Sequence, residues 1–294
     1  MNVHRMPGLD ARDPLGFLAA LGVLRTLSHG DRSARLHWER DGSYVAVVTT
    51  SLSSVIDALW EDVERSRQGD PAIDFALDAD RKEQDLKHPP DAFRKLMRSL
   101  VNVPEAAQFV AAYATGVVVD GSGQTKPTSF HMTAGQQRFM DVIIDLRDKV
   151  TRRDLEEALD GPWIGRDDVK DPRWRAGSER LRALLSFDPS KTKAAVAAGA
   201  AWLAFRALPL FPVVPRGTSA VTTGFTGRGR SEQFTWPVWS IPLLESEARV
   251  VLGLGELERM TRGERSRRGI VAVLRSSVQR SSQGYGNFTA SIPV

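Results

Sequence analysis

The stretch Ala194–Leu210, AAVAAGAAWLAFRALPL, is the most apolar in the chain and decides how the rest is divided. Alanine is the strongest helix former, and a helix that is apolar on all sides is buried. We therefore expect a buried helix from Lys191 to Leu208, ended by Pro209, because proline disrupts a helix interior. From Pro209 to Gly253, Thr, Val, Phe and Trp alternate with Gly and Pro, which is typical of strands and turns.

The part before this stretch has mainly helical patterns. Asp13-Pro14 supplies an acidic N-cap and a proline at the first helical position, so a helix is expected from there to Leu27. Asp41-Gly42 predicts a hairpin turn between strands Ala34–Arg40 and Tyr44–Thr49. Further helices are predicted at Ser51–Arg67, Asp91–Val101, Pro104–Tyr113, Ala134–Val150 and Arg152–Leu159.

The expected fold class is α+β, with a helix-rich N-terminal two-thirds that contains a small antiparallel hairpin and a strand-rich, basic C-terminal third. The parts are residues 1–208 and 209–294, as two domains or one compact unit; the sequence leaves both open. The C-terminal part is expected to hold a basic helix at Ile270–Val278. Its predicted strands are Ala220–Thr226, Gln233–Val238, Ala248–Leu252 and Asn287–Ile292.

Composition excludes several kinds of chemistry. The 294 residues include 40 Lys+Arg, 36 Asp+Glu and no cysteine, which excludes disulfides, cysteine-based metal sites and thiol catalysis. No apolar run reaches the roughly 18 residues of a membrane span, so we expect a cytoplasmic protein without a membrane partner. The net charge of +4 is unevenly distributed: residues 206–294 hold twelve Arg, six Glu and no Lys or Asp, a net +6.

The loop Asp120–Ser129, DGSGQTKPTS, resembles the outline of a phosphate cradle between an apolar run and a helix. A P-loop needs Gly-Lys-Ser/Thr, whereas Thr125 precedes Lys126 and Pro127 follows it. An exposed turn is therefore favoured over a nucleotide-dependent hydrolase, which stays an alternative. Lys126 and the loop glycines could still hold a polynucleotide phosphate without hydrolysis.

The segment that follows this loop offers several hydrogen-bonding groups. His131 has a side chain that titrates near neutrality and suits a general base, but no nucleophile motif surrounds it. Thr133 and Gln136 also have the spacing of a helix capping box, so a purely structural role stays open.

Carboxylates that could bind metal lie in two acidic loops, and the histidines are scattered. Asp167, Asp168 and Asp171 would serve a metal-dependent nuclease, the second enzymatic alternative. Such clusters are more often solvated surface, as are Asp78, Asp80, Glu83 and Asp85. We predict no catalytic residue, no metal ligand and no cofactor.

Arginines of the C-terminal part are the strongest indication of a ligand. They lie in Gly-rich turns near aromatic residues and in a basic run, a pattern typical of phosphate contact and base stacking, although a solvated basic face remains the alternative. A subunit that binds protein alone would instead expose the aromatic-rich 205–240 region. The candidate nucleic-acid-binding arginines are Arg216, Arg228, Arg230, Arg262, Arg265, Arg267 and Arg268.

Four segments together resemble CRISPR-associated proteins of the type I-G (formerly I-U) systems, including large-subunit-like members. In order along the chain they are DPLGFLAALG at 13–22, KPTSFHMTAGQQ at 126–137, Phe211-Pro212 and WPVW at 236–239. The resemblance implies a non-catalytic subunit of an RNA-guided effector complex, large-subunit-like or accessory, with guide RNA or target DNA and other effector subunits as partners. At matching positions it implies Lys126, His131 and Gln136 as binding residues. Many large subunits are longer than this chain.

Overall fold

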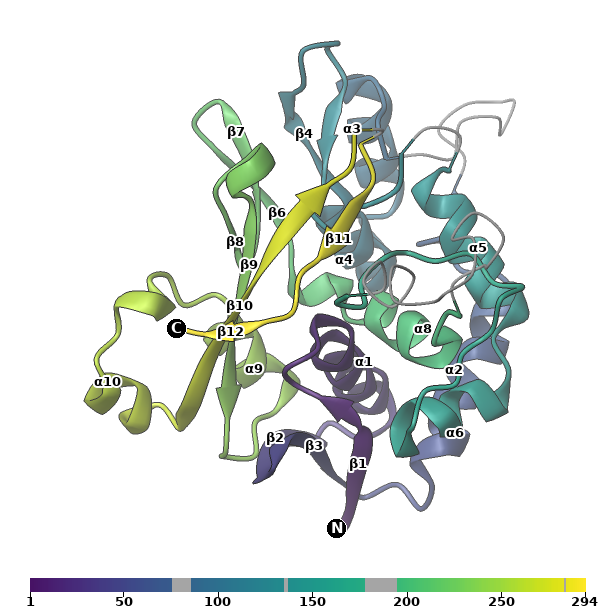
Figure 1. The fold of residues 1–294 in the computed structure, drawn as a ribbon. Helices are drawn as coiled ribbons and strands as arrows, with labels where there is room; N and C mark the ends of the chain where they lie inside the picture. The colour runs from purple at the N-terminus through teal and green to yellow at the C-terminus, as the bar shows by residue number, and fades with distance from the viewer. Residues whose placement is uncertain (76–85, 135–136, 178–194, 283) are drawn as a thin grey trace, which may run out of the picture.

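Two helices far apart in the sequence, α1 (Pro14–Gly30) and α8 (Ala198–Arg206), lie against each other at the centre of the molecule (Figure 1). The computed structural model describes residues 1–75, 86–134, 137–177, 195–282 and 284–294. Every residue of α8 is buried, which confirms the predicted helix over this range. The helices cross closely because Gly22 has no side chain: a Cβ there would lie 1.7 Å from the Leu203 carbonyl oxygen.

The start of α1 is also as predicted. The Asp13 side chain accepts a hydrogen bond from the Leu15 amide at 2.9 Å, and Pro14 occupies the first turn. The remaining helices of this part are α2 (Val55–Arg67), α3 (Pro90–Ser99), α4 (Pro104–Tyr113), α5 (Phe139–Lys149) and α6 (Arg152–Asp160). Of these helices, α2 packs against α1, and α5 and α6 pack against α8, whereas α3 lies beside strand β4 (Ala114–Val119) (Figure 1).

Strands of the N-terminal part form two small antiparallel sheets. One has the order β1-β3-β2, from β1 (Asn2–Asp10), β2 (Arg35–Asp41) and β3 (Ser43–Thr50). Its β2–β3 turn is the predicted hairpin, with Gly42 at φ 65°. The other is the hairpin of β4 (Ala114–Val119) and β5 (Thr125–Pro127). Sequence patterning had not indicated β1 or β5.

The C-terminal part holds most of the remaining strands and two further helices. The first strands are β6 (Val213–Arg216), β7 (Ser219–Thr222) and β8 (Phe225–Thr226). The main sheet has the order β11-β10-β9-β8, and β12 also pairs with β10. The later strands of the C-terminal part are β9 (Gln233–Trp239), β10 (Ile270–Arg280), β11 (Gly286–Phe288) and β12 (Ile292–Pro293). Its helices are α9 (Glu245–Leu252) and α10 (Arg262–Arg267), and its 3-10 turns are η1 (Leu208–Leu210), η2 (Gly229–Ser231) and η3 (Leu257–Arg259).

The predicted fold class was wrong. Helices and strands are interspersed along the chain, with several small antiparallel sheets, and the N-terminal two-thirds are not distinctly helix-rich. Ile270–Val278 belongs to strand β10, which pairs with β9. Leu274 and Val278 pack into the main core, and Ile270 packs into a smaller hydrophobic cluster. Residues 248–252 belong to helix α9 rather than to a strand, since two glutamates favour a helix start in its first turn.

One hydrophobic core extends across the composition change near residue 208. It includes residues from Met6 to Phe288. The Trp236 indole donates to the Ala11 carbonyl at 2.9 Å, and the Trp239 indole donates to the Leu36 carbonyl at 2.8 Å. The two parts of the chain therefore share their interior. In the part that the structure describes, no helix is both long and apolar enough to cross a membrane.

Candidate nucleic-acid interface

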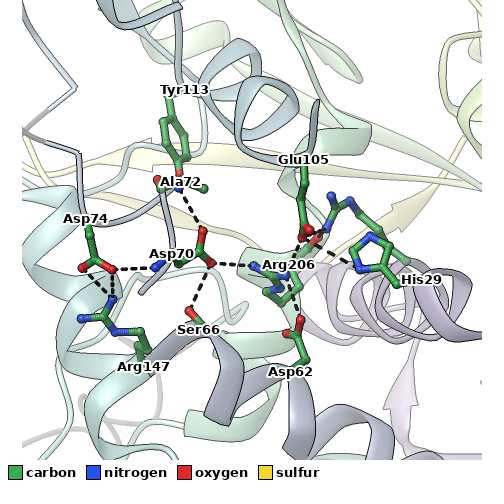
Figure 2. Close-up of polar contacts among 11 residues, drawn as sticks. His29, Asp62, Ser66, Asp70, Ala72, Asp74, Glu105, Tyr113, Arg147 and Arg206 are labelled. Carbon is green, nitrogen blue, oxygen red and sulfur yellow. Dashed lines mark hydrogen bonds and ion pairs between the residues drawn. The ribbon is translucent and has the colours of Figure 1, made fainter. Parts of the chain in front are cut away.

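The most deeply buried charges form an ionic cluster at the junction of α1, α2, α4 and α8 (Figure 2). Arg206, whose side chain is 3% exposed, contacts Asp62 at 2.9 Å, Asp70 at 3.2 Å and Glu105 at 2.7 Å. Arg25 lies 3.6 Å from Glu105. We call these five residues the Arg206 cluster.

The surroundings of the Arg206 cluster point to a structural role. The guanidinium groups of Arg25 and Arg206 lie 4.9 and 5.0 Å from the Phe109 ring centre. Burial, together with the neighbouring Arg206, lowers the pKa of Arg25 to about 10. Both cations are enclosed by helices and matched by carboxylates, so the cluster joins four helices rather than facing a ligand.

A second group of cations lines three contiguous hollows on the surface. The outer hollow, about 480 Å³, is lined by Arg216, Phe225 and Arg228. The middle one, about 220 Å³, is lined by Arg228, Lys126 and Arg280. The inner one, about 480 Å³, is lined by Lys126, Arg280 and His131, and by Lys87 from the segment before α3. Neighbouring hollows share lining residues, and we call the three hollows together the basic groove.

Hydrogen bonds hold the walls of this groove together. Residues 126–132 follow the β4–β5 hairpin, which also contacts β6 and β7 (Figure 1). The Ser129 amide donates to Thr222 Oγ1 at 2.8 Å, and the Gly286 amide donates to the Met132 carbonyl at 3.0 Å. These bonds connect the segment to β7 on one side and β11 on the other. The groove is therefore built by segments more than a hundred residues apart.

Positive charge in the groove is largely uncompensated. Within the described ranges, no ion pair engages Lys126, Arg216 or Arg228. Arg280 does pair with Glu232, at 2.8 Å. Asp120 accepts hydrogen bonds within its own turn, and the bond from the Ser122 hydroxyl is the main reason its pKa is lowered, with Lys87 adding to the effect. Several unpaired cations that line neighbouring hollows suit a polyanion.

The predicted site residues divide between the groove and other places. Lys126, His131, Arg216 and Arg228 come together in the groove. Arg230 is exposed in η2, and Gln136 lies outside the described residues. Arg262, Arg265, Arg267 and Arg268 lie at the far end of β10, whose length from Ile270 to Arg280 is roughly 33 Å at the usual strand rise (Figure 1).

Among these distant arginines, Arg265 has a structural role. Its guanidinium donates to the carbonyl of the C-terminal residue Val294 at 2.6 Å and to the carbonyl of Leu257 at 3.2 Å. Arg268 donates to the Glu264 carbonyl at 3.0 Å. Sequence reasoning missed Lys87, Glu232 and Arg280 as groove residues.

Two regions that suggested alternative functions have local structures that differ from the predicted ones. The Asp120–Ser129 loop is the tip and second strand of a hairpin, so no helix N-terminus completes a phosphate cradle. The predicted helix at Ala134–Val150 begins at Phe139, with Arg138 as N-cap, so Thr133 forms no capping box. Asp168 pairs with Arg166 at 2.7 Å.

No cluster of three metal-ligating side chains occurs in the described part of the chain. Asp78, Asp80, Glu83 and Asp85 lie outside it. The aromatic residues that sequence patterning assigned to base stacking are in the core instead. Their buried members are Phe225, Phe234, Trp236 and Trp239. Burial of these rings also removes the aromatic surface that a purely protein-binding subunit would expose.

No protein-family model matches the chain, and no curated protein matches it by sequence.

Proposed function

We propose that the protein is a non-catalytic, nucleic-acid-binding subunit of a type I CRISPR RNA-guided effector complex. The basic groove holds the phosphate backbone of guide RNA or target DNA, and the other effector subunits are its protein partners. The complex acts in the cytoplasm in antiviral defence. Base pairing, rather than the groove, reads most of the sequence in such a complex.

The observation that carries this proposal is the convergence of unpaired cations from separate segments on one groove. Arg216 and Arg228 lie 90 and 102 residues after Lys126 in the sequence, yet the three residues line adjoining hollows. Arg216 and Arg228 are exposed and Lys126 is half-buried, and none of the three has a carboxylate partner among the described residues. Such cations can contact phosphates, and the release of condensed counterions then favours binding. One of the four segments that resemble type I-G proteins begins at Lys126, and its residues Lys126, Ser129 and His131 help to line the inner part of the groove.

Binding to labelled single-stranded RNA and DNA, measured by fluorescence anisotropy from 50 to 200 mM salt, tests the proposal. If Lys126, Arg216 and Arg228 each contact one phosphate, the slope of log affinity against log salt should be about −2. Replacing Lys126 and Arg228 together by alanine should weaken binding about tenfold or more and make the slope shallower by about 1.4.

A matched control is available in the same chain. The double variant Arg262→Ala/Arg267→Ala removes the same charge from exposed positions at the far end of β10, and its affinity should stay within about twofold of wild type. An equal loss of affinity in both double variants would show that binding depends on net charge alone, and it would contradict the groove as the binding site. Absence of binding at low salt, by the free protein and by the assembled complex, would overturn the proposed function itself.

A further inference from the structure

The inner hollow of the basic groove contains a lysine that the sequence patterns did not indicate. Lys87 lines this hollow together with Lys126, Arg280 and the carboxylates Asp120 and Glu232. Arg280 is paired with Glu232 at 2.8 Å, whereas no ion pair within the described ranges engages Lys87 or Lys126. The two lysines are therefore the cations of the inner hollow that a ligand can use.

A buried threonine fixes the backbone on both sides of Lys87. The Thr125 side chain is fully buried, and its Oγ1 accepts a hydrogen bond from the His88 amide at 3.0 Å and donates one to the Leu86 carbonyl at 3.0 Å. The Thr125 amide also donates to the His88 carbonyl at 2.8 Å. Leu86 and His88 are buried, whereas Lys87 between them is exposed. Three hydrogen bonds therefore hold Lys87 beside Lys126, the residue that follows Thr125.

An ordered backbone makes these lysines better ligand-binding groups. A ligand that must order a flexible segment loses part of its binding free energy to that ordering, whereas a segment ordered in advance avoids the loss. The bonds from Thr125 supply this order at Lys87, and the β4–β5 hairpin supplies it at Lys126 (Figure 1). Both side chains therefore enter the inner hollow from fixed positions.

The charge of the inner hollow indicates which kind of phosphate suits it. Its three lysine and arginine side chains outnumber its two carboxylates, which leaves a net charge of +1 with the histidine neutral. A phosphodiester inside a strand has a charge of −1 and balances this charge. A terminal or free phosphate has about −1.5 to −2 near neutral pH and exceeds it.

We propose that the inner hollow binds one internal phosphodiester of the nucleic-acid strand, with Lys87 as a further phosphate-contacting residue and Thr125 as its positioning residue. This inference rests on the proposed function, because the phosphate belongs to the strand held by the other groove cations. Lys87 then becomes the fourth phosphate contact, and the bound strand extends to the inner end of the groove.

Lys87→Ala tests the contact in the anisotropy titrations with single-stranded RNA and DNA from 50 to 200 mM salt. Four contacts predict a wild-type slope of about −2.8, and the variant should return to about −2. Its affinity should fall about three- to tenfold. Lys95→Ala is the control, because Lys95 is an exposed lysine of α3 that lines none of the three hollows, and its affinity should stay within about twofold of wild type.

The outcomes separate this inference from the proposed function. A wild-type slope of about −2 with unchanged affinity of Lys87→Ala overturns the role of Lys87 and leaves the proposed function intact. Equal losses in Lys87→Ala and Lys95→Ala would make Lys87 a general charge and contradict the contact. No binding at low salt, by the free protein and by the assembled complex, overturns both.

The positioning role of Thr125 is tested by a double-mutant cycle. Thr125→Val removes the hydroxyl and both of its hydrogen bonds, so it should weaken binding about two- to threefold. It should have no further effect on Lys87→Ala, because positioning acts only through that lysine. Thr125→Ser keeps the hydroxyl and should bind as wild type does. The same loss in both backgrounds overturns the positioning role.

Thr50→Val separates positioning from a general loss of stability. Thr50 is also fully buried, and its Oγ1 donates to Asp31 at 2.7 Å and accepts from the Leu52 amide at 3.2 Å. Both valine variants should unfold at lower urea concentrations, but only Thr125→Val should bind more weakly. A matching loss of affinity in Thr50→Val contradicts positioning. The His88 amide should also exchange slowly in the wild-type protein, and rapid exchange would contradict the anchor even where Thr125→Val fails to fold.

Octamers with and without a 5′-phosphate distinguish an internal phosphodiester from a terminal phosphate. The two octamers should bind wild type within about twofold of each other. Tighter binding of the phosphorylated octamer that disappears in Lys87→Ala would show that the inner hollow takes a strand end, and it would overturn the internal phosphodiester.

Discussion

The Arg206 cluster and the basic groove are both rich in arginine, yet their charges have opposite environments. Arg206 is 3% exposed and contacts three carboxylates, whereas Arg216, ten residues later, is exposed with no ion pair among the described residues. A buried ion loses its hydration and depends on its partners. An exposed unpaired cation keeps its hydration until a ligand replaces it. Burial and pairing, rather than residue type, therefore separate arginines that hold the fold from those available for binding.

The largest effect on stability is expected at the Arg206 cluster. Arg206→Met leaves Asp62 and Glu105 without their closest cation, and breaking a buried ion pair in this way lowers the free energy of unfolding by about 3–5 kcal/mol. Urea denaturation followed by circular dichroism measures the change. Arg262→Met, at an exposed position, is the control and should change stability by less than about 0.5 kcal/mol.

A companion variant keeps this prediction testable even where Arg206→Met fails to fold. Adding Asp62→Leu removes the abandoned carboxylate, so the double variant should recover part of the loss. A single Arg206→Met variant within 1 kcal/mol of wild type would show that the cluster is dispensable, and the contrast with the groove would be lost.

Much of the N-terminal fold followed from local signals. Asp13-Pro14 and Asp41-Gly42 determine a helix start and a turn through their own backbone preferences, and both predictions were confirmed. Residues 270–278 of strand β10 were predicted as a helix, and this prediction was wrong. Their extended conformation depends on pairing with β9, which is distant in the sequence. Sheet pairing is a long-range property that local composition does not contain.

The sequence identified individual cations of the groove but not that they lie close together. Lys126 and Arg228 were candidates from their own loops, but their meeting depends on hydrogen bonds such as that from Ser129 to Thr222. The aromatic residues beside the arginines suggested base stacking, since a sequence does not distinguish a ring in the core from one on the surface. Charge patterning therefore identified cations without separating Arg228, in the groove, from Arg265, which holds the C-terminus.

An intermediate effect is expected at Asp13, a half-buried carboxylate with no ion pair in the described structure. Burial raises its pKa to about 6, although the Leu15 and Ala176 amides donate to it. Between about pH 4 and pH 6 the folded state therefore keeps a proton that the unfolded state has released. The contribution of Asp13 to the free energy of unfolding should fall as the pH rises through this window.

Asp13→Asn keeps the cap but does not titrate. The unfolding free energy of the variant minus that of wild type should rise by about 1–3 kcal/mol from pH 4 to pH 7. The other titrating groups contribute equally to both proteins and cancel in this difference. Urea denaturation at four pH values gives both profiles. Parallel profiles would show that Asp13 ionises normally, and burial without a partner would then have no effect on this carboxylate.

The smallest effect on stability is expected in the groove. Arg216→Ala/Arg228→Ala should leave the free energy of unfolding within about 0.5 kcal/mol of wild type, since neither side chain has an ion pair among the described residues to lose. Any change should be a slight gain at low salt, because neighbouring like charges repel each other. The same variant should bind single-stranded nucleic acid about tenfold more weakly. A loss of more than 1 kcal/mol would place these arginines with Arg206 as structural cations, whereas weakened binding at unchanged stability is what a ligand-binding surface requires.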